Sequence, residues 1–190
     1  WLGWFGFNGG SQLAAGTLED ITSVATIFIN TNLAACGGVM TAALLSRLIG
    51  GKTDVILMLN GAIAGLVAIT AEPLAPSPFL SIVIGAVGGA IMYFATKLLF
   101  SLKIDDVVGA IPAHFFAGIW GTLAVPMSNS DTSFSSQFTG VISITVFVFI
   151  VSYIVWKILD AAAGIRISKE DEKIGTDKVE IGVIAYGIRD

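Results

Sequence analysis

Six apolar segments separated by short polar loops constrain this chain more than any other feature. They cover residues 1–16, 23–49, 55–70, 79–100, 107–126 and 141–159. A helix needs roughly 20 mostly apolar residues to cross the hydrocarbon core of a bilayer. Only 13% of the residues are charged, whereas a soluble domain carries about 25%. The sequence therefore predicts an all-α polytopic membrane protein with six transmembrane helices.

The Lys and Arg residues test this division independently, because cytoplasmic loops collect basic residues. All ten of them lie in alternate loops or at and beyond the end of the last apolar segment: Arg47, Lys52, Lys97, Lys103, Lys157, Arg166, Lys169, Lys173, Lys178 and Arg189. This pattern predicts a cytoplasmic C-terminus in a multi-pass protein of the cell membrane. Polarity rises abruptly after the sixth segment, so we expect a membrane region over 1–161 and a cytoplasmic tail over 162–190.

Small residues recur at helical spacing inside two neighbouring segments, in "GAIAG" (residues 61–65) and "GAVGG" (residues 85–89). Such spacings let helix backbones approach closely where association depends on packing. We therefore expect these two segments to belong to a tightly packed bundle.

His114 is the only histidine and lies well inside the fifth segment. An ionisable residue within a membrane helix is a candidate functional residue. Helical spacing would align it with three small residues, Ala110, Gly118 and Thr122, in a stripe that could line a narrow pore. The alternative is a structural histidine that bonds a neighbouring helix. Asp105 and Asp106 precede this helix, where carboxylates cap free N–H groups, so we interpret both as structural.

The first segment places Trp4, Phe7 and Ser11 at helical spacing. Aromatic faces beside a hydroxyl can hold a small cation by cation–π attraction and one hydrogen bond. The alternative is that these aromatic residues face lipid or the core. Thr70, at the end of the third segment, is ambiguous in the same way, because a Thr at a helix end usually bonds a backbone carbonyl.

The residue types in the membrane segments argue against an enzyme. They offer no carboxylate pair, no metal-ligand cluster and no nucleophile beside a base. The single cysteine, Cys36, has no mate for a disulfide in this chain. We expect no metal and no cofactor.

Five motifs in series resemble those of the ammonium transporter family (Amt/Mep/Rh), and the resemblance spans nearly the whole chain. They are "WFGFNGGS", "NTNLAACGG", "LNGAIAGLVAIT", "IDDVVGAIPAHFFAGIWGTLA" and "GIRISKEDEKIGTDKVEIGVIAYG". The resemblance implies the second inverted repeat and the last helix of an eleven-helix protein, with this chain beginning inside the sixth helix. It also implies a homotrimer with one pore in each subunit.

The resemblance implies roles for particular residues. Phe7 matches a pore-gating phenylalanine, Ser11 the hydroxyl of the outer ammonium site, Thr70 a vestibule threonine and His114 the second of two pore histidines. Trp4 and Asn8 belong to the same first motif and join the predicted substrate and pore residues. Ammonium would be recruited at the outer site and deprotonated. Ammonia would then cross the apolar pore past the histidine, with the proton relayed separately.

The tail motif implies a regulatory segment that includes Gly164, Arg166, Asp177 and Tyr186 and that couples to a signal protein of the PII type. Ile181 and Val183 replace polar residues common there, which weakens the expectation of a PII partner. Ala113 and Phe115 flank the histidine where many bacterial members have a glycine after it. Two alternatives to a transporter are an ammonium sensor with the same fold and a non-transporting subunit of a mixed trimer.

Overall fold

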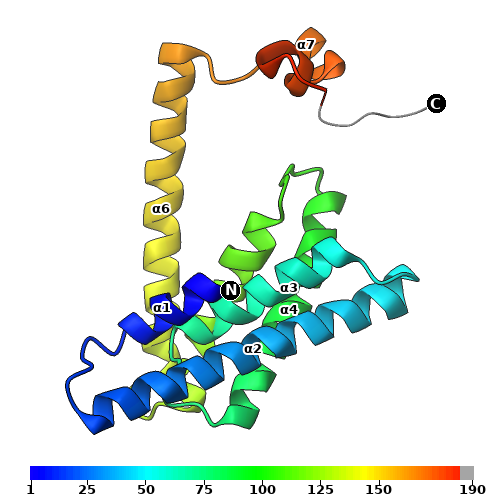
Figure 1. Cartoon of the computed structure of the whole chain (residues 1–190). Helices are drawn as coiled ribbons and strands as arrows, with labels where there is room; N and C mark the ends of the chain where they lie inside the picture. The colour runs from blue at the N-terminus through cyan, green and yellow to red at the C-terminus, as the bar shows by residue number, and fades with distance from the viewer. Residues whose placement is uncertain (185–190) are drawn as a thin grey trace. The chain divides into compact units, whose positions relative to one another are not determined.

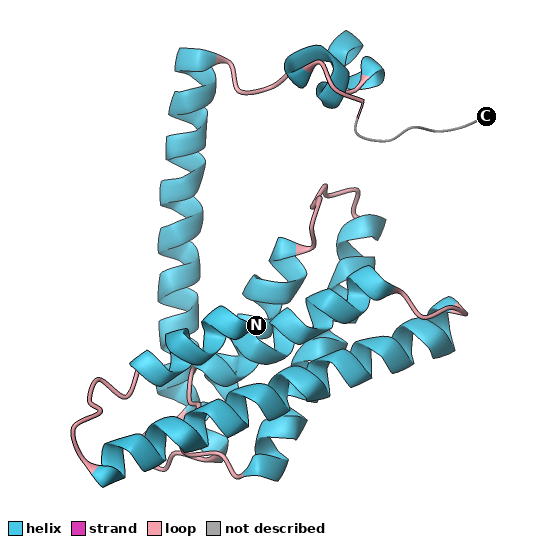
Figure 2. Cartoon of the chain, viewed as in Figure 1, coloured by secondary structure: helices cyan, strands magenta, loops and turns pink. Residues whose placement is uncertain are grey.

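The computed structural model describes residues 1–184, and these form helices joined by short loops, with no strand in that range (Figures 1 and 2). The elements are α1 (Leu2–Gly10), α2 (Leu18–Gly50), α3 (Val55–Thr70), α4 (Pro78–Ser101), η1 (Ile111–Phe116), α5 (Ala117–Ala124), η2 (Val125–Met127), α6 (Phe134–Ala163), α7 (Lys169–Ile174) and η3 (Asp177–Ile181). η1 and η3 are π-helical and η2 is a 3-10 turn. The predicted all-α class is confirmed.

The chain divides into two compact units, Trp1–Val141 and Ile142–Asp190. The second unit contains most of α6, which has no buried residue, followed by α7 and η3. This division follows packing, whereas the boundary predicted at 161/162 follows polarity. The polarity boundary stays a prediction.

Among the described residues, three helices are long and apolar enough to cross a membrane: Leu18–Gly50, Pro78–Ser101 and Phe134–Ala163. Two shorter apolar helices cover Val55–Thr70 and Ile111–Met127. The predicted first segment, 1–16, is helical only over nine residues. The predicted fifth segment begins with the π-helical turn Ile111–Phe116 and becomes α-helical from Ala117. The chain is thus a multi-pass membrane protein, while the count of six crossings stays a prediction.

Side-chain caps start the long helices of the first unit. Thr17 and Asp20 form a reciprocal capping box at α2: the Thr17 hydroxyl accepts from the Asp20 N–H at 3.1 Å, and the Asp20 carboxylate accepts from the Thr17 N–H at 3.0 Å. Asp54 caps α3 and Ser77 caps α4 in the usual one-way manner. Each cap satisfies a backbone donor that the helix itself leaves free.

Replacing Thr17 with alanine should destabilise the start of α2 by about 1 kcal/mol, because the capping box loses its hydroxyl acceptor. Amide hydrogen exchange over residues 18–22 measures this directly. Thr22→Ala is the matched control, since the Thr22 hydroxyl only bonds the Leu18 carbonyl within the helix. Equal protection losses in the two variants would contradict the capping role.

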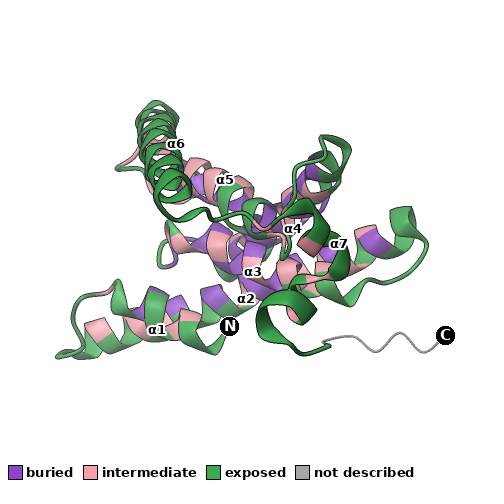
Figure 3. Cartoon of the chain, turned by 90° about the horizontal axis from the view of Figure 1, so that it is seen from above, coloured by how far each residue is buried: buried purple, intermediate pink, exposed green. Residues whose placement is uncertain are grey.

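Small residues hold α2, α3 and α4 together. Gly38 of α2 lies against both Gly61 of α3 and Gly89 of α4. A Cβ added at Gly61 or Gly89 would stand 2.7 or 2.6 Å from the Gly38 carbonyl oxygen. Helix backbones therefore meet with no side chain between them, and the packing predicted from "GAIAG" and "GAVGG" is confirmed. Figure 3 shows the buried residues gathered on α2 to α5.

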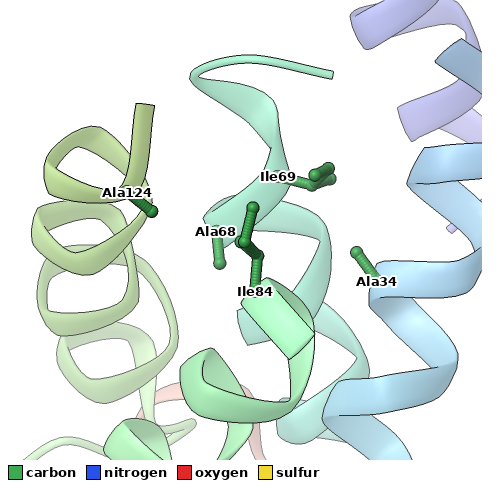
Figure 4. Packing of buried hydrophobic residues seen from close by; sticks show 5 residues of the cluster. All are labelled: Ala34, Ala68, Ile69, Ile84 and Ala124. Carbon is green, nitrogen blue, oxygen red and sulfur yellow. The ribbon is translucent and has the colours of Figure 1, made fainter. Parts of the chain in front are cut away.

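A cluster of buried side chains from four helices completes this core (Figure 4): Ala34, Ala68, Ile69, Ile84 and Ala124. Trp120 packs against it and donates its indole N–H to the Ile84 carbonyl at 2.9 Å. Gly121 of α5 lies against the Ala68 backbone of α3. These contacts fix α5, and with it the π turn that precedes it, on α3 and α4.

Candidate functional site

The histidine-bearing π turn η1 starts from a double cap. One oxygen of the Asp106 carboxylate accepts from the Ala110 N–H at 2.9 Å, and the other accepts from the Ile111 N–H at 2.8 Å. Asp106 thus satisfies two backbone donors at the start of this turn. Asp105 is exposed beside it and lines a neighbouring cavity of about 570 Å³.

His114 lies in the middle of the π turn Ile111–Phe116. A π turn is bonded from residue i to i+5 rather than i+4, so residues four apart no longer stand directly above one another. The predicted stripe from Ala110 to Thr122 is therefore wrong across this segment. Pro112 is the second residue of this segment, where an N–H has no intrahelical acceptor, so its ring is compatible with the turn. Such turns occur frequently at functional sites.

Trp4 joins three of the predicted site residues into one cluster. Its ring stacks on the His114 imidazole, with centroids 6.3 Å apart and planes inclined by 27°. It meets the Phe7 ring edge-on at 5.9 Å. Its indole N–H donates to the Thr70 hydroxyl oxygen at 2.8 Å. We call Trp4, Phe7, Thr70 and His114 the aromatic–histidine cluster.

The Thr70 hydroxyl makes two hydrogen bonds. It donates to the Leu66 carbonyl at 2.7 Å, as expected for a Thr at a helix end, while it accepts from Trp4. The hydroxyl proton is therefore committed to the backbone. Thr70 fixes the direction of the Trp4 ring, which in turn faces His114.

The first motif contributes two further predicted residues, Asn8 and Ser11, which lie outside the aromatic–histidine cluster. Asn8 is fully buried, and its amide donates to the Thr31 hydroxyl of α2 at 3.0 Å. It holds α1 against α2. Ser11 follows the end of α1, is exposed, and bonds the Phe7 carbonyl at 3.4 Å. Among the described residues, no hydrogen bond joins Ser11 to Trp4, Thr70 or His114.

The cluster is open on one side. Phe7 is 65% exposed, and His114 is also exposed, whereas Ala113 and Ala117 next to it are buried. Both site side chains thus stand on a wall whose back is the glycine-rich core. An imidazole on an apolar wall can accept at one ring nitrogen while it donates from the other.

Two asparagines that donate hydrogen bonds to loop carbonyls, Asn60 and Asn30, are not among the residues predicted from the sequence. The Asn60 amide donates to the Val108 carbonyl at 2.9 Å, just before the π turn. The Asn30 amide donates to the Pro73 and Pro76 carbonyls at 3.0 and 2.9 Å, in the loop after α3. Both asparagines lie inside apolar segments, where a polar side chain is costly, and that position was the signal that could have found them.

The tail residues lie in the second unit. Gly164 ends α6 with a left-handed φ of 64°, and its N–H donates to the Asp160 carbonyl at 2.9 Å. Arg166 lies 3.8 Å from the Glu172 carboxylate in an exposed pair. Asp177 opens η3, and its carbonyl accepts from the Val183 N–H. Tyr186 lies outside the described residues.

Known proteins resemble this chain over nearly its whole length. It is 41% identical to "Ammonium transporter Amt2" of Archaeoglobus fulgidus, with 98% of the chain and 43% of that protein covered. It is 37% identical to the "Ammonium transporter" of Bacillus subtilis, with 98% and 49% covered. The chain thus spans less than half the length of these curated relatives.

Solved structures give the same result. A "Sensor Amt Protein" superposes with a TM-score of 0.85 at 30% identity, over 95% of this chain and 46% of that one. Candida albicans Mep2 superposes with a TM-score of 0.81 at 28% identity, over 96% and 44%. The model of the Ammonium Transporter Family matches residues 1–186. Its members are transporters rather than enzymes. This multi-pass chain belongs to the ammonium transporter family.

Proposed function

We propose that this chain forms one wall of a pathway that carries ammonium, as ammonia and a separately relayed proton, across the cell membrane. The observation that carries the proposal is the aromatic–histidine cluster, found in a chain of this family. Trp4 stacks on the His114 ring and also contacts Phe7. Two aromatic faces and one imidazole therefore follow one another along an apolar surface.

The cluster supports a stepwise passage. The exposed Phe7 face, with the Ser11 hydroxyl one turn further on, attracts a partly dehydrated ammonium ion through cation–π and hydrogen-bond interactions. Loss of water makes the charged form costly and favours release of a proton. The neutral ammonia then passes the apolar wall. The His114 imidazole accepts a hydrogen bond or proton at one nitrogen and donates from the other.

In this scheme, Trp4 and Thr70 serve to orient the aromatic and imidazole rings of the cluster. The hydrogen bond between them holds the indole ring across the face of His114. Asn8, buried against Thr31, keeps α1 in place so that Trp4 and Phe7 stay on the same wall. Reconstitution of the intact transporter that carries this chain, with uptake of labelled methylammonium competed by ammonium, tests the proposal. Absence of competed uptake would overturn it.

Trp4→Phe should lower the transport rate by about threefold to tenfold, because the ring loses the hydrogen bond to Thr70 that fixes its direction. Labelled methylammonium uptake in proteoliposomes measures the rate. Trp120→Phe is a matched control, since it also removes an indole hydrogen bond, to the Ile84 carbonyl at 2.9 Å. The control should lose stability but keep its rate per folded protein. Equal rate losses would count against a specific role for Trp4.

A sensor is the second candidate function, and one observation favours it: the superposition on a "Sensor Amt Protein" with a TM-score of 0.85. A sensor would bind ammonium at the same cluster and report it through a conformational change. It would conduct no ammonium, and this separates the two candidates in a flux measurement.

The assembly and the tail complete the proposal. The transporter would be a homotrimer in the plasma membrane with the tail in the cytoplasm, as the basic loops indicate. A protein of the PII type would be a regulatory partner of the tail. Ile181 and Val183 are 74% and 60% exposed there, so such a partner would meet an apolar surface where other family members present polar side chains.

A further inference from the structure

We infer that Asn60 is a positioning residue that sets the orientation of His114. This inference rests on the proposed function, in which His114 takes part in transport, but it concerns a residue on a different helix. Asn60 belongs to α3, whereas His114 lies in the π turn η1, and the two are joined through the loop that precedes η1. The Asn60 amide donates to the Val108 carbonyl at 2.9 Å.

The loop between α4 and η1 has few other attachments of its own. Val107 and Val108 are 89% and 68% exposed, so their side chains contribute little packing. Within the part of the chain that the structure describes, Asp106 bonds only within the loop and to the start of η1. The hydrogen bond from Asn60 therefore holds this loop in a fixed position relative to the neighbouring helix.

Gly109 follows Val108, and the Asn60 side chain also restricts the position of its backbone. Its φ of +74° is left-handed, and a Cβ placed there would stand 2.5 Å from the Asn60 amide nitrogen. Only glycine fits both the conformation and the close approach. The Asn60 side chain thus touches the backbone at two consecutive residues.

The next link runs from Gly109 to the histidine. The Gly109 carbonyl accepts from the Ala113 N–H at 3.1 Å, and Ala113 is 1% exposed in the core. His114 is the following residue. A shift at Val108 or Gly109 therefore rotates the first turn of η1 about the buried Ala113. The His114 ring would then turn relative to the Trp4 ring on which it stacks.

The test uses variants that separate the donor from the shape and the charge of Asn60. Asn60→Leu removes the donor to Val108 without adding a charge. Asn60→Asp removes the same donor and keeps nearly the same side-chain shape, but adds a charge. Asn60→Gln keeps an amide. Asn32→Leu is the matched control, because Asn32 is an exposed asparagine elsewhere on α2. All are made in the intact protein.

Two readouts are measured. Nitrogen-15 spectra of labelled histidine report the tautomer and surroundings of His114, whose signals are identified by their loss in His114→Gln. Methylammonium uptake gives the maximal rate and the half-saturating concentration. We expect both donor-removing variants to shift the His114 signals and to lower the maximal rate about tenfold, with the half-saturating concentration within about twofold. Asn60→Gln should restore part of the rate.

Unchanged His114 signals in Asn60→Leu and Asn60→Asp would overturn the inference, as would an equal shift in Asn32→Leu. If neither donor-removing variant folds, Gly109→Ala provides the same test, because its Cβ displaces the Asn60 amide, and unchanged His114 signals there would also overturn it. Shifted signals in a protein whose transport does not depend on His114 would support the positioning role and refute the proposed function instead.

Discussion

His114→Ala is expected to lower the ammonium-evoked current of the reconstituted transporter by about 100-fold or more, or to leave a poorly selective conductance. General acid–base groups contribute about 10²-fold to 10⁴-fold to the steps in which they take part. His114 is the one histidine of the chain, and it stands exposed on the wall that also carries Phe7 and Trp4. Its loss would remove the group that we propose accepts and donates protons along this wall.

The controls separate proton relay from packing. His114→Gln keeps a polar side chain of similar size but has no basic ring nitrogen that can take up and release a proton, so it should also lose the current. Phe116→Leu alters volume in the same π turn, where Phe116 packs edge-on against Phe115 at 5.4 Å, and should keep the current. Wild-type current in His114→Ala would contradict the assigned role.

Gly85→Ala should be the most destabilising single-methyl change in the helical core. A Cβ at Gly85 of α4 would overlap the carbonyl group of Ala34 in α2, and both backbones belong to packed helices. Neither can move aside as a flexible side chain would. Overpacking of this kind costs about 1–3 kcal/mol or more.

Thermal unfolding in detergent measures this effect. Gly140→Ala is the matched control, because nothing lies within 4 Å of a Cβ added at Gly140 in α6. The control should be neutral or slightly stabilising, since alanine favours a helix over glycine. Equal unfolding temperatures for Gly85→Ala and the wild type would contradict the close contact of α2 and α4.

The parts of the fold that follow local rules were predictable from the sequence. Apolar length predicted an all-helical membrane chain, and the spacing of small residues predicted close packing of the two segments that hold Gly61 and Gly89. A carboxylate before a helix favours a cap, and Asp106 accepts from two N–H groups at the start of η1. Each of these features depends on residues close together in the chain or on a strong periodic pattern.

The site itself was only partly predictable. Trp4, Phe7, Thr70 and His114 were each expected at the site, but the hydrogen bond from Trp4 to Thr70 joins residues 66 positions apart, and no local rule places them together. The π turn escaped prediction because a helical spacing of four was assumed through Pro112. Asn60 is marked by its place inside an apolar segment, but its partner is a backbone carbonyl 48 positions away, which no local rule identifies.

The most direct test of ammonium transport is the ammonium-evoked current of the intact wild-type protein in liposomes, measured over a range of pH with potassium as the comparison ion. We expect a saturable current with ammonium, little current with potassium, and no saturable, ammonium-selective current in His114→Ala. Ammonium binding with a conformational response but without current or uptake would contradict transport and identify the protein as a sensor.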